Sequence, residues 1–210
     1  MAALIDEIHR KIEANWSISN YHKGSEENWR FEKQTNISDE NLSPEVKIER
    51  AIVNIPEQVW ADAPYWANQV PTASGLVHPN ADRSRKIDLV HKRGDRAYEF
   101  IELKVGSDTP LYAAMEILKY GVLYVFARER EEIFSSAKKG HELLRAEKIL
   151  LKVLAPATYY AEYDLSWLEN CIKTGLDKFL TQRKIKLEMD FEFSSLPLIP
   201  SSSPVTWKKV

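Results

Sequence analysis

The sequence predicts an α/β fold in which a mixed central sheet is flanked by helices. Two observations indicate this class. The patterned segments follow one another as a helix, two hairpin strands, a helix, a strand, a helix and a strand. The hairpin segments, residues 86–90 and 98–105, are rich in Ile, Leu and Val, which is typical of strands buried within a sheet.

We divide the 210 residues into three parts. Residues 1–42 begin with an amphipathic helix, because apolar residues recur at helical spacing, and continue as a polar loop, so that this part is a cap or an arm. Residues 43–195 hold the α/β domain. Residues 196–210 form a tail rich in Pro and Ser, which we expect to be extended.

Each element of the domain has its own signal. A helix is predicted from residue 43 to residue 53, with Ser43 as its N-cap and Pro44 at the first helical position. Residues 75–78 are interpreted as a short first strand, ahead of the hairpin. The remaining elements are a helix over 111–130, a strand over 148–155, a helix over 167–182 and a strand over 186–193.

Ionisable residues interrupt the two apolar hairpin strands. Asp88 lies in the first strand, and Glu102 and Lys104 lie two residues apart in the second. Because side chains alternate across a strand, Glu102 and Lys104 share one face, opposite Ile101 and Leu103. We expect the apolar face to pack on a core while the acid and the lysine point away from it. Charge is costly inside a strand, so three such groups together indicate a metal site.

The hairpin turn decides whether the two acids meet. With a five-residue loop over residues 93–97, Asp88 faces Glu102 on the neighbouring strand. A tighter, two-residue turn at Arg93-Gly94 would instead place Asp88 opposite Glu99. We prefer the longer loop because it also aligns the two apolar faces. Opposed carboxylates repel each other unless a cation lies between them, and oxygen ligands of this kind suit Mg²⁺ or Mn²⁺.

A plain structural interpretation competes with the metal site. Hairpins often carry Asp, Glu and Lys on a solvated face, where such pairs contribute only about a few tenths of a kcal/mol. The Ile, Leu and Val residues around these charges argue for a buried sheet and therefore favour the metal site. The five histidines are scattered, and no pair of them has the spacing of zinc ligands.

The order of Asp88 and then Glu102-Leu103-Lys104 resembles the signature of the PD-(D/E)xK nuclease superfamily, which has the restriction-endonuclease-like fold. Asp88 stands in the place of the first Asp, and Glu102 and Lys104 stand in the places of the second acid and the lysine. The chain departs from the pattern at Ile87, where the family often has Pro, and it lacks a strongly basic face. The resemblance covers roughly residues 43–165.

This resemblance implies a metal-dependent nuclease that hydrolyses the phosphodiester bonds of nucleic acid, with DNA as the expected substrate. Asp88 and Glu102 would hold Mg²⁺ or Mn²⁺, together with the backbone carbonyl of Leu103. Lys104 would orient the attacking water or stabilise the developing charge.

A helix before the hairpin commonly contributes another acid in this superfamily. Glu45 and Glu49 lie one turn apart on one face of the helix predicted over residues 43–53. We expect Glu49 to be the additional catalytic acid, with Glu45 as the alternative.

The helix after the hairpin has Glu116 and Tyr120 where some branches, including RecB-type exonuclease domains, carry Gln-x-x-x-Tyr. Ordinary packing between helix and sheet explains Tyr120 equally well. Arg85, Lys86, Lys119 and Tyr120 are the expected substrate contacts.

The charge of the chain limits the kind of nucleic-acid binding. A net charge of −2 argues against tight, nonspecific coating of nucleic acid, because Lys and Arg supply most of such affinity. A second hypothesis is therefore a catalytically inactive nuclease-like module that binds nucleic acid or a protein partner. In a third, an interaction protein, Lys104 simply pairs with Glu102 or Asp88.

Location and assembly follow from simpler features. The single cysteine, Cys171, excludes an intrachain disulfide and fits a reducing cytoplasm. No apolar run approaches the roughly 20 residues that span a bilayer, so no membrane partner is expected. Many small members of the superfamily dimerise to cut two strands, so a homodimer is one assembly that the resemblance implies.

Overall fold

The computed structural model describes residues 1–18, 27–34, 43–54, 65–77, 85–106, 108–131, 141–196 and 208–209. Its centre is a six-stranded sheet in the order β1-β2-β3-β4-β5-β6. Strands β3, β4 and β5 are parallel to one another, and the other neighbours are antiparallel. This confirms the predicted α/β class with a mixed sheet. The strands are β1 (Tyr65–Pro71), β2 (Lys86–Gly94), β3 (Ala97–Leu103), β4 (Lys148–Ala155), β5 (Glu188–Ser195) and β6 (Lys208–Lys209).

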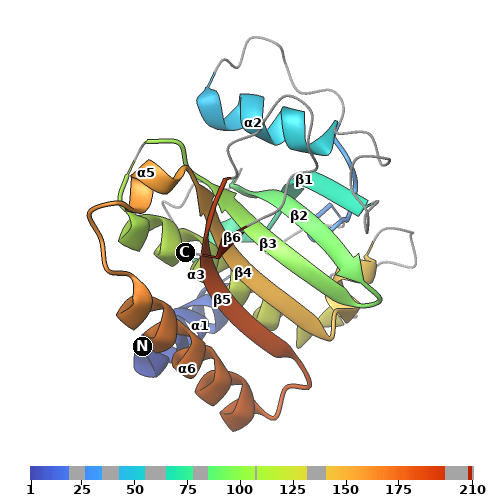
Figure 1. Ribbon diagram of the computed structural model, residues 1–210. Coiled ribbons are helices and arrows are strands. Elements are labelled where there is room, and N and C mark those ends of the chain that lie inside the picture. Colours follow the sequence, from blue (N-terminus) through green and yellow to red (C-terminus); the bar gives the residue numbers. More distant parts are fainter. Residues whose placement is uncertain are drawn as a thin grey trace.

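Helices flank the sheet on both faces (Figure 1). One face carries α1 (Ala2–Trp16), α3 (Pro110–Arg128) and α6 (Ser166–Arg183). The other face carries α2 (Pro44–Val53). The short helix α5 (Ala157–Tyr160) follows β4, and the 3₁₀ helices are η2 (Ser74–Leu76) and η3 (Glu142–Arg145).

The main core lies between the sheet and helices α1, α3 and α6. Its largest buried side chains include Trp29, whose ring stacks on Phe100 with centroids 6.4 Å apart and meets the edge of Tyr124. Helix α1 contributes Ile5 and Ile12, which are completely buried in the same core. Aromatic and aliphatic burial of this extent is the main stabilising contribution to the fold.

A second, smaller core lies on the opposite face of the sheet, so that both faces are buried. We expected Glu102 and Lys104 to point away from the core, and that prediction is wrong. Phe100 shares their side of β3 and belongs to the main core, which α3 covers. The smaller core consists of Ile52, Val53, Leu89, Ile101, Leu103 and Leu154.

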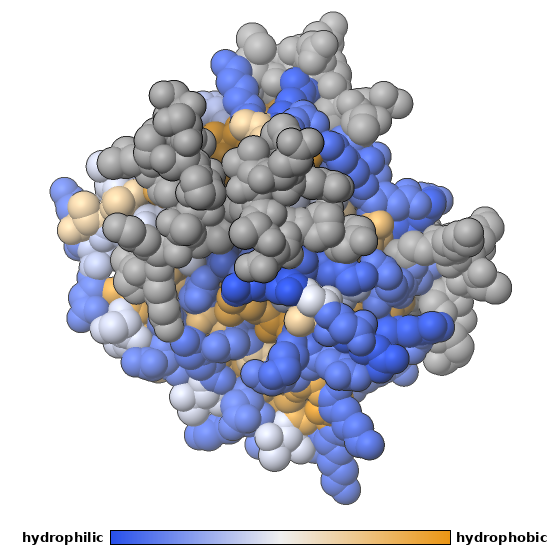
Figure 2. All heavy atoms as spheres, turned by 45° about the vertical axis from the view of Figure 1, so that its right-hand side comes forward, coloured by the Kyte–Doolittle hydropathy of each residue, from blue (hydrophilic) through white to orange (hydrophobic). Residues whose placement is uncertain are grey.

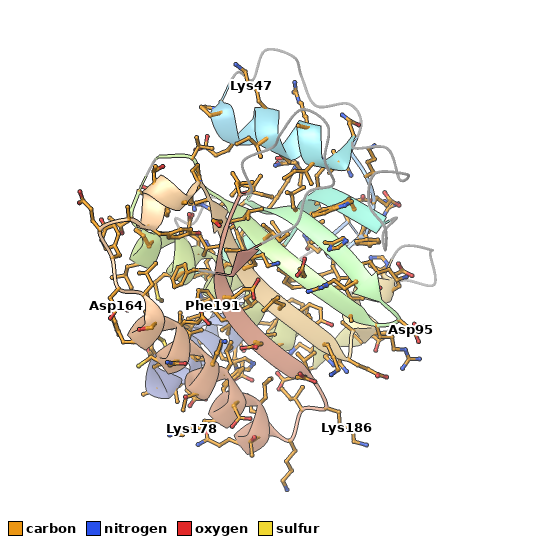
Figure 3. All side chains as sticks on the ribbon, in the orientation of Figure 1. Lys47, Asp95, Asp164, Lys178, Lys186 and Phe191 are labelled. Carbon is orange, nitrogen blue, oxygen red and sulfur yellow. The ribbon has the colours of Figure 1, made fainter. Side chains whose placement is uncertain are left out.

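The hairpin of β2 and β3 has the register that the longer loop predicted. Leu89 pairs with Ile101, which sets Asp88 opposite Glu102 across the two strands. The acidic residues therefore meet at the end of the hairpin that is remote from its turn. Asp95, labelled in Figure 3, marks the turn itself.

The turn is tighter than the predicted loop over residues 93–97. β2 continues to Gly94 and β3 begins at Ala97, so that two residues connect the strands. An irregularity between Lys92 and Gly94 adds one residue to β2. The turn residues are Asp95 and Arg96, and the one-residue bulge shifts the pairing so that Asp88 stands opposite Glu102 instead of Leu103.

The first strand of the sheet lies elsewhere than predicted. β1 covers Tyr65–Pro71 and pairs with β2, whereas residues 75–77 of the predicted strand 75–78 belong to or directly follow η2, and His78 lies outside the described residues. β1 is an edge strand, and proline is tolerated at such a position. Its Gln69 has a φ of 51°, which distorts the regular alternation on which strand prediction depends.

The other elements of the domain agree with the sequence. Ser43 accepts a hydrogen bond from the Val46 N–H at 3.2 Å and so caps α2, with Pro44 at its first position. Helices α3 and α6 and strands β4 and β5 lie within a few residues of their predicted bounds. Most of the predicted polar loop, namely 19–26 and 35–42, and most of the tail lie outside the described residues.

Helix α3 approaches β4 closely at Gly121. A Cβ atom at this position would lie 2.7 Å from Leu151 Cδ1 and 3.3 Å from Met189 Sδ. Protein interiors are packed densely enough that such an atom would displace its neighbours. The absence of a side chain therefore permits the observed distance between helix and sheet.

The described surface is mixed in character. Figure 2 shows one face on which hydrophilic residues predominate, with smaller hydrophobic areas between them. Within the described ranges, none of the helices combines the length and the hydropathy that crossing a membrane requires.

Candidate active site

The predicted site residues gather where β3 ends and α3 begins. Glu102 lies near the end of β3, and Lys104 follows directly after the strand. Asp88 is the third residue of β2, which is antiparallel to β3. The first turns of α3 add Glu116 above them.

Lys104 is the centre of this charged cluster. Its Nζ donates a hydrogen bond to Glu116 Oε2 at 2.7 Å and lies 3.1 Å from Glu102 Oε1. Asp108 Oδ2 is a third acidic neighbour at 3.6 Å. Burial opposes the charge, but Glu102 and Glu116 outweigh it and raise the pKa of Lys104. The lysine is therefore a fixed cation with little freedom to move.

Asp88 is half-buried beside the cluster. Its Oδ2 accepts a hydrogen bond from the Leu103 N–H at 2.9 Å. Burial raises the pKa of Asp88 to about 7, and the charge of Glu49 adds to this effect while Leu103 and Lys104 oppose it. Near neutral pH, the carboxyl group is therefore poised between its two protonation states.

Glu102 has one oxygen that no described residue satisfies. The residue is 6% exposed, Oε1 faces Lys104, and Oε2 is buried without a hydrogen-bond partner among the described residues. Burial, followed by the charges of Asp88 and Glu116, raises the pKa of Glu102 well above its usual range. An unsatisfied buried oxygen costs free energy, which a proton or a bound cation would recover.

Helix α2 brings Glu49 to the edge of the sheet. Its two oxygens accept hydrogen bonds from Asn68 Nδ2 at 2.7 Å and from Gln69 Nε2 at 2.6 Å. Burial raises the pKa of Glu49, whose charge in turn reaches Asp88. Of the two candidates on α2, Glu49 is thus the buried acid directed at the site, whereas Glu45 is more exposed. Asn68 and Gln69 were not predicted as site residues, because β1 was not recognised as a strand.

Glu116 connects two cations. One oxygen accepts the hydrogen bond from Lys104, and the other is paired with Arg85 Nη1. Although burial opposes it, the Lys104 hydrogen bond and the surrounding cations lower the pKa of Glu116. A carboxylate at this position therefore remains charged and fixes Arg85 and Lys104 at once, which a neutral Gln would do less strongly.

The other predicted substrate contacts lie at different depths. Tyr120 is 3% exposed, and Lys119 Nζ lies 4.6 Å from the centre of its ring. Burial, and then the neighbouring Arg85, lower the pKa of Lys119. In contrast, Lys86 is exposed at the start of β2. Tyr120 therefore packs in the main core, and of the predicted substrate contacts Arg85 is the one that pairs with an acid of the site, Glu116.

A separate group of three side chains could hold a metal ion. His9 Nε2 lies 3.0 Å from Glu129 Oε2, and its Nδ1 lies 3.5 Å from Glu13 Oε2. Arg130 and Arg183 already pair with these carboxylates, at 3.6 Å to Glu13 and 3.8 Å to Glu129. A cation bound there would therefore lie among carboxylates that two guanidinium groups already neutralise. The cluster was not predicted from the sequence, because Glu129 lies far from His9 along the chain.

Comparison with known proteins identified no relative. No family model matches the chain, and no curated protein and no solved structure matches it either. The function must therefore be inferred from the geometry and chemistry of these residues.

Proposed function

We propose that the chain is a metal-dependent nuclease of the PD-(D/E)xK type, with a restriction-endonuclease-like core, which hydrolyses phosphodiester bonds in DNA. The observation that carries this proposal is the buried oxygen of Glu102 that finds no hydrogen-bond partner in the described part of the chain, on a residue that stands opposite Asp88. Two acids with raised pKa values at one place are typical of a site that a cation completes. Oxygen ligands of this kind favour Mg²⁺ or Mn²⁺.

The residues around Glu102 supply the parts that such hydrolysis needs. Asp88, Glu102 and the Leu103 carbonyl would hold Mg²⁺, and the ion would supply a bound water of lowered pKa. Lys104, fixed by its acidic neighbours, would stabilise the negative charge that develops on the phosphate. Glu49 would accept hydrogen bonds from water at the same site.

A metal titration tests the proposal. We expect calorimetry to detect Mg²⁺ or Mn²⁺ binding to the wild type and to lose it in Glu102→Gln, with cleavage of DNA lost in parallel. Glu188→Gln is the matched control, because Glu188 is an exposed acid on β5. The titration is repeated with a non-cleavable oligonucleotide, since substrate phosphate completes many Mg²⁺ sites. Unchanged metal binding in Glu102→Gln would contradict the assignment.

A second candidate function is a nuclease-like module that binds nucleic acid without cutting it. The observation that favours it is the set of ion pairs around Lys104, which ties Glu102 and Glu116 to a lysine. The same titration separates the two functions. Binding of nucleic acid with no uptake of metal and no cleavage would identify the module.

Glu116 is expected to act as a positioning residue for Lys104 and Arg85. We predict that Glu116→Gln lowers the cleavage rate roughly tenfold, or about 1.4 kcal/mol of transition-state stabilisation. Because Glu116 helps to raise the pKa of Lys104, the alkaline limb of the pH–rate profile should move to lower pH. The profile of the exposed-acid control Glu142→Gln should not move, and coincident profiles for all three proteins would refute the role.

The location and assembly of the nuclease complete the proposal. Cys171 is an exposed, free thiol, which fits a reducing compartment such as the cytoplasm. A homodimer would present two sites for cutting both strands of a duplex, whereas a monomer would cut one strand at a time. Sedimentation of the protein with and without DNA measures this assembly directly.

A further inference from the structure

An exposed aromatic ring stands at the outer end of the site. Tyr112, in the first turn of α3, is 46% exposed, and Lys104 Nζ lies 5.8 Å from the centre of its ring. Its backbone N–H donates to Thr109 Oγ1, the N-cap of the helix, so that the residue is firmly anchored. Single exposed aromatic residues are common, but this one contacts the central cation of the site.

The charged groups lie beneath this ring. Glu102, Lys104 and Glu116 are only 6%, 8% and 8% exposed. Along α3, Tyr112, Glu116 and Tyr120 follow at intervals of four residues and thus share one face of the helix. On this face Tyr112 is exposed, Glu116 binds Lys104, and Tyr120 is buried.

Two cations accompany this face. Arg85 is partly exposed and lies between Glu116 and Tyr112: although burial opposes it, the Tyr112 hydroxyl and Glu116 raise its pKa. Lys119 contacts the ring of Tyr120. Within the described part of the chain it forms no ion pair with a carboxylate. A cation without a carboxylate partner is suited to bind a phosphate.

The exposed ring of Tyr112 and the recessed acids would favour unpaired nucleic acid over a duplex. Stacking on an aromatic side chain contributes about 1–3 kcal/mol per base, but only to a base with a free face. In a duplex that face is covered, and exposing it costs about a few kcal/mol. The recessed acids add to this preference, because a phosphate must leave the regular duplex surface to reach them.

We propose that the site acts on single-stranded nucleic acid, with a base next to the scissile phosphate stacked on Tyr112 and the flanking phosphates bound by Arg85 and Lys119. This inference rests on the proposed nuclease function and names its substrate class. Such a substrate needs only one site and no second protomer.

Binding of short fluorescent oligonucleotides tests the inference. Single strands and duplexes of one sequence, in DNA and RNA forms, are titrated with Ca²⁺ in place of Mg²⁺ and are then offered for cleavage with Mg²⁺. We expect Tyr112→Ala to weaken single-strand binding about tenfold, a loss of about 1.4 kcal/mol, and to leave duplex binding unchanged. Tyr112→Phe should bind like the wild type. So should Leu111→Ala, the matched control, which removes an equally exposed side chain without a ring.

The outcomes separate this inference from the nuclease proposal. Unchanged single-strand binding in Tyr112→Ala, or equal binding and cutting of duplex, overturns the inference, while the nuclease proposal survives if Asp88→Asn abolishes cleavage. Single-strand binding that depends on Tyr112, without any cleavage, supports the stacking role of Tyr112 but overturns the nuclease proposal and, with it, the action on a scissile phosphate. Absence of binding to every oligonucleotide overturns both.

Discussion

Asp88→Asn is expected to abolish cleavage and to stabilise the metal-free protein above neutral pH. The folded state raises the pKa of Asp88 from 3.8 to about 7, so the wild type loses stability as the pH rises through this interval. The full shift would correspond to about 4 kcal/mol, and because Asp88 is half-buried we expect about 1–2 kcal/mol. Asn can still accept the Leu103 N–H through its side-chain oxygen.

Urea denaturation at pH 5 and pH 8, without metal, measures the effect on stability. The gain should be full at pH 8, smaller at pH 5 and absent only below the ordinary pKa of 3.8, because between 3.8 and about 7 the folded protein holds a proton that the unfolded chain has lost. Saturating Mg²⁺ should stabilise the wild type and not the variant, because only the wild type would bind the ion. Cleavage of DNA by Asp88→Asn at the wild-type rate would contradict the role assigned to Asp88.

The largest loss of stability is expected from Lys152→Met, on the other face of the sheet. Lys152 Nζ donates to Glu99 Oε1 at 2.7 Å, and both side chains are almost completely buried. Burial opposes ionisation of Glu99, yet His91 and Lys152 lower its pKa to about 2. Without Lys152, this carboxylate would lose its buried cation, which typically costs about 3–5 kcal/mol. Thermal or urea unfolding at pH 7 measures the loss.

The pH dependence and a control make this prediction specific. Wild-type Glu99 contributes stability above its ordinary pKa and loses that contribution as the pH falls toward about 2. The deficit of Lys152→Met should therefore shrink in acid. Lys148→Met is the control on the same strand, because Lys148 and its partner Glu188 are both exposed, and it should not change stability measurably. Equal stability of the two variants would contradict the importance of the buried pair.

The sequence predicted those parts of the fold that depend on local pattern. The register that sets Asp88 opposite Glu102 followed from strand alternation, and the start of α2 followed from Ser43 and Pro44. β1 was missed because proline and an irregular Gln69 mask its alternation. The bulge between Lys92 and Gly94 was not predicted, because no residue type in this segment indicates it.

Prediction of the site residues also succeeded only where local pattern determines their positions. Asp88, Glu102 and Lys104 were found because they lie within one hairpin. Their burial was not predicted, because it depends on α3 folding back over β3, which strand alternation does not encode. Asn68 was missed for the related reason that β1, which positions it beside α2, was itself not predicted.

The glycine at position 121 has a consequence beyond packing. Since α3 carries Glu116 and β3 leads into Lys104, the 2.7 Å hydrogen bond between those residues joins the helix to the end of the sheet. The spacing that Gly121 permits over Leu151 therefore also bears on where Glu116 lies relative to Lys104. A methyl group at position 121 would have to displace Leu151 or the helix, and a shift of the helix would carry Glu116 away from Lys104.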